Sequence, residues 1–220
     1  MADIVIFGAG DIAELAQFYF SHDTDHRVAA FAVDGAYLTT DKFCGLPVIA
    51  FEELAAGFPP ARHDGFVALS YAGLNRLRAD KCAAMRSAGY RLLCYVSSRA
   101  TVFPDLNTGD NCLILEDNTI QPRVRIGDNV TLWSGNHIGH HSVIEDNVFV
   151  SSHVVVAGGV TVGEGSFLGI NSTIRDHVRI GRNCVVGAGA LIERDTEEGS
   201  VYTAPRAEKS PVPSNRLRRL

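Results

Sequence analysis

The chain has 220 residues, of which 46% are hydrophobic, and it carries a formal net charge of −5. This length allows two compact domains, and the negative charge argues against nucleic acid as the main partner. No apolar run approaches the roughly 18 residues needed to span a membrane, and no basic-then-apolar leader opens the chain. The cysteines are scattered and never spaced as CxxC, which favours reduced thiols and a cytoplasmic location.

The chain opens with a pattern typical of a nucleotide-binding fold. Residues 3–7 read as a short buried strand, and a Gly-Ala-Gly-Asp turn at residues 8–11 leads into a helical segment. In such an opening the glycines let a phosphate approach the helix N-terminus. A second strand is expected to end at Asp34, where these folds place an acid that contacts a ribose. Any βαβ unit can carry such a turn for packing alone, so the motif by itself leaves both interpretations open.

Strands and helices continue to alternate through the first part of the chain. Alternation of this kind is typical of a small parallel sheet covered by helices. We therefore expect a Rossmann-like α/β domain over residues 1–96. Its further elements are expected as strand 45–49, helix 51–54, strand 65–69, helix 76–88 and strand 91–96.

The rest of the chain carries an uninterrupted hexapeptide repeat. Every sixth residue from Ile114 to Ile192 is aliphatic, and from Ile126 onward the residue four places later is small, β-branched or Asn. A period of six fits neither a helix nor a hairpin meander. It fits a parallel β-helix, in which three short strands joined by tight turns make one coil of eighteen residues. The repeat predicts this β-helix over residues 97–209, followed by a polar tail at 210–220.

Histidines gather in the middle of the repeat. Coils of eighteen residues place His140 and His141 beside Gly158 and Gly159 of the next coil, where two absent side chains are expected to leave space for a substrate. An imidazole titrates near neutral pH, so it is suited to accept a proton from an amine or hydroxyl. Four of the eight histidines fall within seventeen residues, and none occupies an inward aliphatic position: His137, His140, His141 and His153.

Three interpretations of this histidine cluster remain open from the residues themselves. The first is general-base catalysis of acyl transfer. The second is a zinc site shared between subunits, as in β-helical carbonic anhydrases, although that family needs a different histidine spacing. The third is a set of turn histidines that hydrogen-bond between coils. His153, which stacks between Gly135 and Asn171, is expected to line a neighbouring edge, and His177 is expected at the surface.

Three segments of the repeat are more specific than the period itself: 138–144 (IGHHSVI), 157–163 (AGGVTVG) and 167–172 (FLGINS). Behind a small Gly-x-Gly α/β domain, this pattern resembles the PglD/NeuD-like sugar acyltransferases over nearly the whole chain. The resemblance implies a left-handed β-helix and a homotrimer. It also implies acetyl-CoA in the groove between adjacent β-helices and the nucleotide of an activated amino sugar on the N-terminal domain.

The resemblance assigns roles to individual residues. It places the general base on His140, and because the carboxylate that often follows is replaced by His141, Glu145 is a candidate partner for the base. A second family histidine corresponds to Phe149, and His153 is expected to replace it. The residues implied for acetyl-CoA are Gly158, Gly169, Asn171 and Gly187. Those implied for the nucleotide sugar are Gly8, Gly10, Asp11, Asp34, Ser70, Asn75 and His153.

The sequence therefore predicts an acetyl-CoA-dependent N-acetyltransferase acting on a nucleotide-linked amino sugar. His140 would take the proton as the amine attacks the thioester, and a backbone N–H within 157–159 would stabilise the oxyanion. Trimer packing would create three equivalent grooves. The alternatives are a sugar O-acetyltransferase of the same fold and a non-catalytic nucleotide-binding scaffold, with a dehydrogenase as a weaker variant. No metal, nucleic acid or membrane span is expected.

Overall fold

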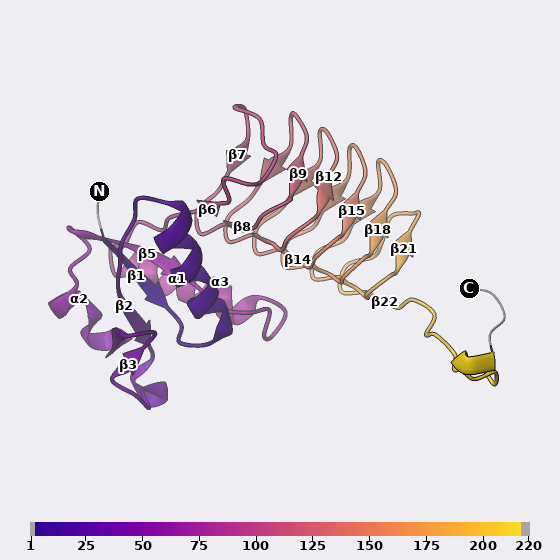
Figure 1. Cartoon of the computed structure of the whole chain (residues 1–220). Helices are drawn as coiled ribbons and strands as arrows, with labels where there is room; N and C mark the ends of the chain where they lie inside the picture. Colours follow the sequence, from indigo (N-terminus) through magenta and orange to yellow (C-terminus); the bar gives the residue numbers. More distant parts are fainter. Residues whose placement is uncertain (1–2, 217–220) are drawn as a thin grey trace.

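An α/β domain leads directly into a β-helix that extends away from it, as the computed structural model shows for residues 3–216 (Figure 1). The α/β sheet has the order β3-β4-β2-β1-β5, and all its pairings are parallel except β3 with β4. Its elements are β1 (Asp3–Phe7), α1 (Asp11–Asp23), β2 (Val28–Val33), β3 (Lys42–Phe43), β4 (Leu46–Ala50), α2 (Leu54–Gly57), β5 (His63–Val67) and α3 (Arg76–Ser87), with short 3-10 turns at Gly35–Tyr37 and Phe51–Glu53.

The segment 91–96, predicted as one more strand of the α/β sheet, is divided between the two domains. Only an isolated bridge joins Leu92 to Gly65 of β5. The next residues form β6 (Tyr95–Val96), which pairs with the β-helix. Leu92 packs in the α/β core, whereas Val96 packs against the β-helix core. The apolar run is continuous because the chain passes from one core to the other, so the prediction of a single strand was wrong.

The predicted β-helix is confirmed. Each hexad contributes one two-residue strand, and strands pair in parallel with those one coil away, as Arg125 pairs with Val143. The strands are β7 (Asn107–Thr108), β8 (Leu113–Ile114), β9 (Thr119–Ile120), β10 (Arg125–Ile126), β11 (Thr131–Leu132), β12 (His137–Ile138), β13 (Val143–Ile144), β14 (Phe149–Val150), β15 (Val155–Val156), β16 (Thr161–Val162), β17 (Phe167–Leu168), β18 (Thr173–Ile174), β19 (Arg179–Ile180), β20 (Val185–Val186), β21 (Leu191–Ile192) and β22 (Val201–Tyr202).

These strands form three flat faces around one apolar core. The first face has the order β22-β20-β17-β14-β11-β8-β6, the second β21-β18-β15-β12-β9, and the third β19-β16-β13-β10-β7. The second residue of each strand points inward, and from Ile114 to Ile192 all these residues are at most 5% exposed. Burial of this aliphatic ladder is what stabilises the coils. After β22 the described part of the chain closes with a short 3-10 turn at Ser214–Arg216. The last four residues of the predicted tail lie outside the described range.

The corners of the coils repeat as regularly as the core. One residue in each hexad has a positive φ, a conformation that Gly, Asn, Asp and His adopt more readily than other residues. His141, His153 and His177 all occupy this corner position, whereas His137 and His140 do not. Corner geometry therefore accounts for three of the histidines. The full series is Asn111, Asp117, Arg123, Asn129, Gly135, His141, Asn147, His153, Gly159, Gly165, Asn171, His177, Asn183 and Gly189.

The preference of the corner positions for Gly, Asn, Asp or His is called the corner rule here. It predicts a stabilising substitution at Arg123, which has a φ of 68° and a side chain 73% exposed. We expect Arg123→Asn to raise the free energy of unfolding by about 1 kcal/mol, because Asn tolerates the left-handed conformation better than Arg. Denaturant unfolding would measure the change. Arg125→Asn, on a neighbouring strand, is the control and should not stabilise. Equal effects of the two substitutions would contradict the corner rule.

Candidate functional site

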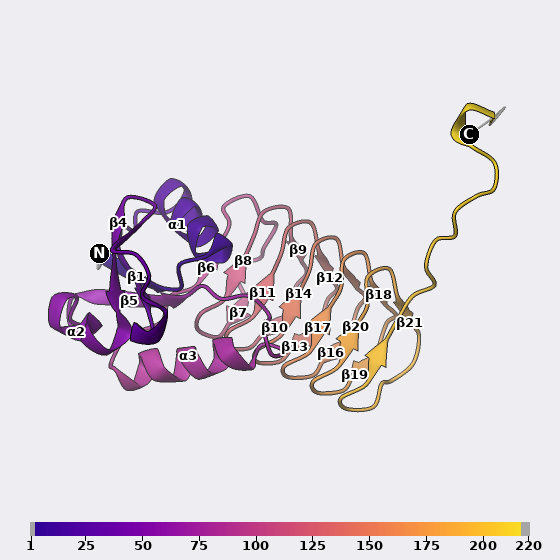
Figure 2. The ribbon, with the colours of Figure 1, turned by 90° about the horizontal axis from the view of Figure 1, so that it is seen from below.

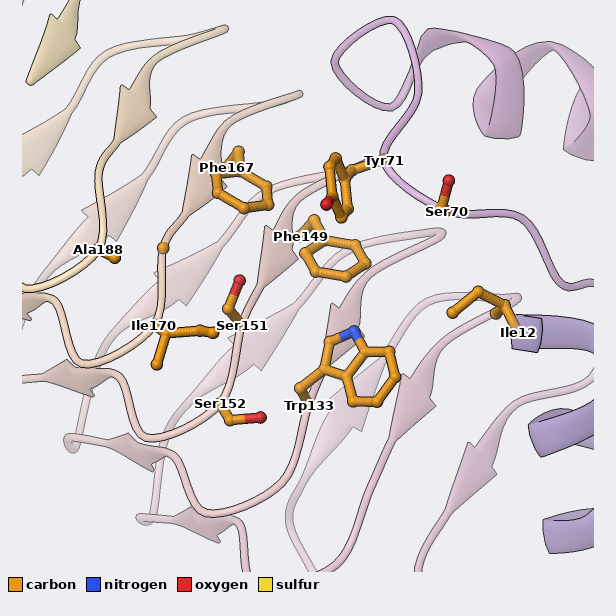
Figure 3. Close-up of a pocket in the computed structure, with 11 residues that line it drawn as sticks. Ile12, Ser70, Tyr71, Trp133, Phe149, Ser151, Ser152, Phe167, Ile170 and Ala188 are labelled. Carbon is orange, nitrogen blue, oxygen red and sulfur yellow. The ribbon is translucent and has the colours of Figure 1, made fainter.

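A cavity of about 430 Å³ lies between the α/β domain and the first face of the β-helix (Figure 3). The α/β domain contributes Ile12 of α1 and the loop after β5, and successive coils of the β-helix contribute the rest. No lining residue is charged. The lining residues are Ile12, Ser70, Tyr71, Trp133, Phe149, Ser151, Ser152, Phe167, Gly169, Ile170 and Ala188.

Aromatic rings form the wall of this cavity. Phe149 and Phe167 occupy equivalent outward positions on adjacent coils, and their rings stack with centroids 5.6 Å apart and planes inclined by 15°. The Tyr71 ring lies against both, at 5.0 Å from Phe149 and 4.9 Å from Phe167. Trp133 extends the wall beside Phe149. This wall was not predicted from the sequence, although the eighteen-residue spacing of the two phenylalanines was a usable signal.

The second group of candidate residues lies at the turn between the second and third faces. The exposed rings of His140 and His141 meet there, with their Nδ1 atoms 3.1 Å apart. A hydrogen bond between two neutral imidazoles needs one donor and one acceptor. The backbone N–H of His140 also donates to Oε1 of Gln121 at 2.8 Å. His140 is therefore held from both its ring and its main chain.

The glycines beside this pair play a different part from the one predicted. A Cβ at Gly158 would lie 2.7 Å from Cε1 of His140, and a Cβ at Gly159 would lie 2.5 Å from Nδ1 of His177. The space expected for a substrate is thus occupied by the imidazoles themselves. The absence of a side chain at Gly158 is what lets the His140 ring lie against the next coil.

Glu145, the acid proposed to assist the base, is not brought to the histidine pair. It follows β13, at the opposite end of that strand from His140, and its Oε2 accepts from the N–H of Glu164 at 2.9 Å. No hydrogen bond joins it to either histidine within residues 3–216. The partner of His140 in the structure is His141.

The residues predicted for the nucleotide are dispersed. A Cβ at Gly8 would lie 2.6 Å from the backbone oxygen of Ala68, so this glycine is needed for packing. Gly10 has no neighbour within 4 Å of a Cβ and leaves open space at the start of α1, where Asp11 is exposed. Asp34 accepts a hydrogen bond from Lys81 Nζ at 2.6 Å.

Ser70 and Asn75, which were also predicted to bind the nucleotide, lie in different surroundings. Ser70 lines the cavity. Asn75 is fully buried, and its Nδ2 donates to the backbone oxygen of Gly165 at 3.2 Å. Asn75 thus joins the α/β domain to the β-helix instead of facing the cavity. Its positive φ of 65° marks a tight turn, and no sequence signal distinguished such an anchor from a ligand-binding amide.

The remaining predicted residues lie along the turn between the first and second faces. Gly169 lines the cavity, and a Cβ there would lie 2.6 Å from the backbone nitrogen of Ala188. Asn171 and His153 are exposed corner residues, and the His153 ring lies over Gly135. A Cβ at Gly187 would lie 2.9 Å from the backbone oxygen of Tyr202. The cavity and the histidine pair therefore border opposite margins of the second face.

Across residues 3–216, no three or more His, Cys, Asp or Glu side chains gather in an arrangement that could hold a metal ion. No helix in the same range combines the length and apolarity needed to cross a membrane.

Comparisons with known proteins agree with this architecture. The model of the bacterial transferase hexapeptide family (six repeats) matches residues 123–158 and 159–194. A mutant of perosamine N-acetyltransferase from Caulobacter crescentus, in complex with CoA and GDP-perosamine, has a TM-score of 0.83 and 26% identity, over 91% of this chain and 93% of that chain. No match was found among curated proteins.

Two more distant structures share the fold. The acetyltransferase domain of PglB from Neisseria gonorrhoeae FA1090, in complex with acetyl coenzyme A, has a TM-score of 0.80 and 22% identity, over 91% of this chain and 95% of that chain. WeeI from Acinetobacter baumannii AYE has a TM-score of 0.78 and 18% identity, over 91% and 96%. Together with the stacked parallel coils, these likenesses show that residues 123–194 carry the repeats of the bacterial transferase hexapeptide family and that the chain has the left-handed β-helix fold of these acetyltransferases.

Proposed function

We propose that the protein transfers an acetyl group from acetyl-CoA to the amine of a nucleotide-linked amino sugar. The observation that carries this proposal is the His140–His141 pair, a base whose Nδ1 is already bonded, held against Gly158. The likeness to an N-acetyltransferase in complex with CoA and GDP-perosamine supports the substrate class. All five cysteines are free thiols. Because thiols stay reduced in the cytoplasm, we also propose a cytoplasmic location.

His140 would act as the general base. When its Nδ1–H donates to Nδ1 of His141, its Nε2 lone pair is free to take a proton. The sugar amine forms a bond to the thioester carbonyl carbon and gives its proton to Nε2. The C–S bond then breaks, and the proton passes to the departing thiolate of CoA. Transfer is direct, so no covalent enzyme intermediate is needed.

The oxyanion of this reaction needs a backbone donor. The N–H groups of Ala157 and Gly159 already donate, to the carbonyls of Ile174 at 3.0 Å and His140 at 2.8 Å. We therefore assign the donor to the N–H of Gly158, beside the His140 ring. A preorganised donor of this kind stabilises the charge that develops in acyl transfer.

A homotrimer would complete the site. His140 and the cavity border opposite margins of the second face, and a ring of copies places one margin of each chain against the other margin of the next. The third face carries the outward residues Arg125 and Arg179, whereas no Asp, Glu, Lys or Arg points outward from the described strands of the second face. The outward residues of the second face are Thr119, His137, Val155, Thr173 and Leu191. Depletion of charge marks the core of an interface. We propose that the second face packs between copies, with acetyl-CoA in the groove beside Gly169.

Assembly gives a direct prediction. Val155 lies on the second face and is 41% exposed, so Val155→Asp should place charges in the packed interface, release monomers and abolish transfer. Sedimentation velocity and thiol release from acetyl-CoA would measure the two effects. Thr161→Asp, at an outward position of the third face, is the matched control and should leave both unchanged. An active Val155→Asp monomer would rule out a site shared between copies.

The reaction itself is tested by thiol release from acetyl-CoA across nucleotide-linked amino sugars and their hydroxyl analogues. We expect turnover with an amino sugar and an amide in the product by mass spectrometry. Turnover with hydroxyl analogues alone would make the protein an O-acetyltransferase. Nucleotide binding without any turnover would favour a scaffold.

A further inference from the structure

Helix α3 lies where the α/β domain meets the β-helix (Figure 2). It carries a buried cation, Arg78. Arg78 is 1% exposed, and its Nε and Nη2 donate to Oδ1 and the backbone oxygen of Asn129 at 2.9 and 3.0 Å. Its Nη1 has no hydrogen-bond partner. Burial lowers the pKa of Arg78 to about 10, so the guanidinium is still protonated at neutral pH.

No carboxylate neutralises this guanidinium within the described part of the chain. The nearby acids Asp110 and Asp128 pair with Arg86, at 3.5 and 2.6 Å. Asn129 instead belongs to a row of neutral amides, in which Asn111 Nδ2 donates to Asn129 Oδ1 at 3.0 Å. Amide dipoles stabilise a charge without cancelling it. A buried charge that lacks a counter-ion is costly, and this cost calls for an explanation.

One aromatic ring links Arg78 to the cavity. The guanidinium carbon lies 5.7 Å from the centroid of Phe149, and the same ring forms part of the cavity wall. Because the lining residues are uncharged and the surroundings are apolar, the potential of Arg78 is weakly screened there. The field of Arg78 therefore reaches the cavity from behind Phe149, although no cation lines the cavity.

We propose that Arg78 determines specificity, making the cavity selective for an acceptor that carries a diphosphate over its uncharged analogue. The inference rests on the proposed function, because it names the charge of the same acceptor. Arg78 acts through its field, from behind Phe149, and does not touch the reacting atoms. Binding of the anion offsets the cost of the buried cation.

Two substitutions with opposite structural effects test this proposal. Arg78→Met removes the charge and its hydrogen bonds. Asn129→Asp keeps the acceptor of Arg78 and places a counter-ion on it, at the loss of the hydrogen bond from Asn129 Nδ2 to Asn147 Oδ1 at 2.8 Å. Asp tolerates the positive φ at that corner. Arg91→Met is the control, because Arg91 is exposed, pairs with Asp64 of β5 and does not line the cavity.

Calorimetry would compare UDP, GDP and dTDP with uridine, guanosine and thymidine. We expect the wild type to prefer a diphosphate, and both Arg78→Met and Asn129→Asp to lose about tenfold in affinity for it, with nucleoside affinity unchanged. Arg91→Met should retain the preference. Thermal unfolding of each variant separates a field effect from lost packing. Asn129→Asp loses one hydrogen bond, to Asn147, and should lower the melting temperature less than Arg78→Met, which loses both bonds of the guanidinium, yet the two should lose diphosphate affinity alike.

Two results would overturn the proposal. One is a wild type that binds diphosphate and nucleoside equally, whatever the transferase assay shows. The other is a preference that survives in Asn129→Asp, which would leave Arg78 a purely structural role. Failure of acetyl transfer with the diphosphate preference intact would instead reject the proposed function alone.

Discussion

Replacement of His140 by Asn is expected to lower kcat/KM for acetyl transfer by about 10²–10⁴-fold, the usual contribution of a general base. Asn removes the basic nitrogen of the ring and adds no bulk beside Gly158, and the hydrogen bond from the Gly159 N–H to the His140 carbonyl at 2.8 Å still joins the two coils. The fall should lie in kcat, with KM for acetyl-CoA little changed. Thiol release would measure it, and thermal unfolding would check that the coils remain intact.

His141→Asn is the matched control for this experiment. Position 141 has a φ of 60°, and the equivalent corners 147 and 171 already carry Asn, so the backbone should accept the change. Loss of the ring partner of His140 should reduce turnover less than loss of His140 itself. A larger loss at 141 than at 140 would reverse the two roles, and full activity in His140→Asn would exclude it as the base.

Gly139→Ala is expected to destabilise the β-helix by about 3 kcal/mol, the upper end of the cost of overpacking. A Cβ at Gly139 would lie 2.5 Å from the backbone carbon of Ala157 and the nitrogen of Gly158. Backbone atoms cannot rotate away as a side chain can, so two coils must separate. The same shift moves the proposed oxyanion donor away from His140, and activity should fall together with stability.

Denaturant unfolding would measure the loss at Gly139. Gly57→Ala serves as its control, because a Cβ at Gly57 meets nothing within 4 Å, and its effect should lie within about 0.5 kcal/mol. If both substitutions were equally mild, the close approach of adjacent coils at Gly139 would be wrong.

The β-helix could be predicted from the hexapeptide repeat alone. Its inward rungs and left-handed corners recur every six residues, and each depends only on its own hexad and on the copies one coil away. The unbroken six-residue repeat from Ile114 to Ile192 therefore predicted the core. The position of His140 beside Gly158 followed from the eighteen residues that make one coil. The corner residues carry a further signal that was not used. Asn147 and Asn171 occupy the same position in their hexads as His141, which marks His141, but not His140, as a corner residue.

The features that the two domains form together could not be predicted from the repeat and became visible in the folded chain. The cavity joins Ile12 and Ser70 to Phe149, residues with no periodic relation, because docking of one domain on another is not encoded in either repeat. For the same reason the sequence did not show that Asn75 joins the α/β domain to the β-helix. Nor did it show that the apolar segment 91–96 passes from the core of one domain to the core of the other. Arg78 is the clearest case. A charged residue on a basic helix is expected to face solvent, but the packing of α3 against Asn129 and Phe149 buries this side chain.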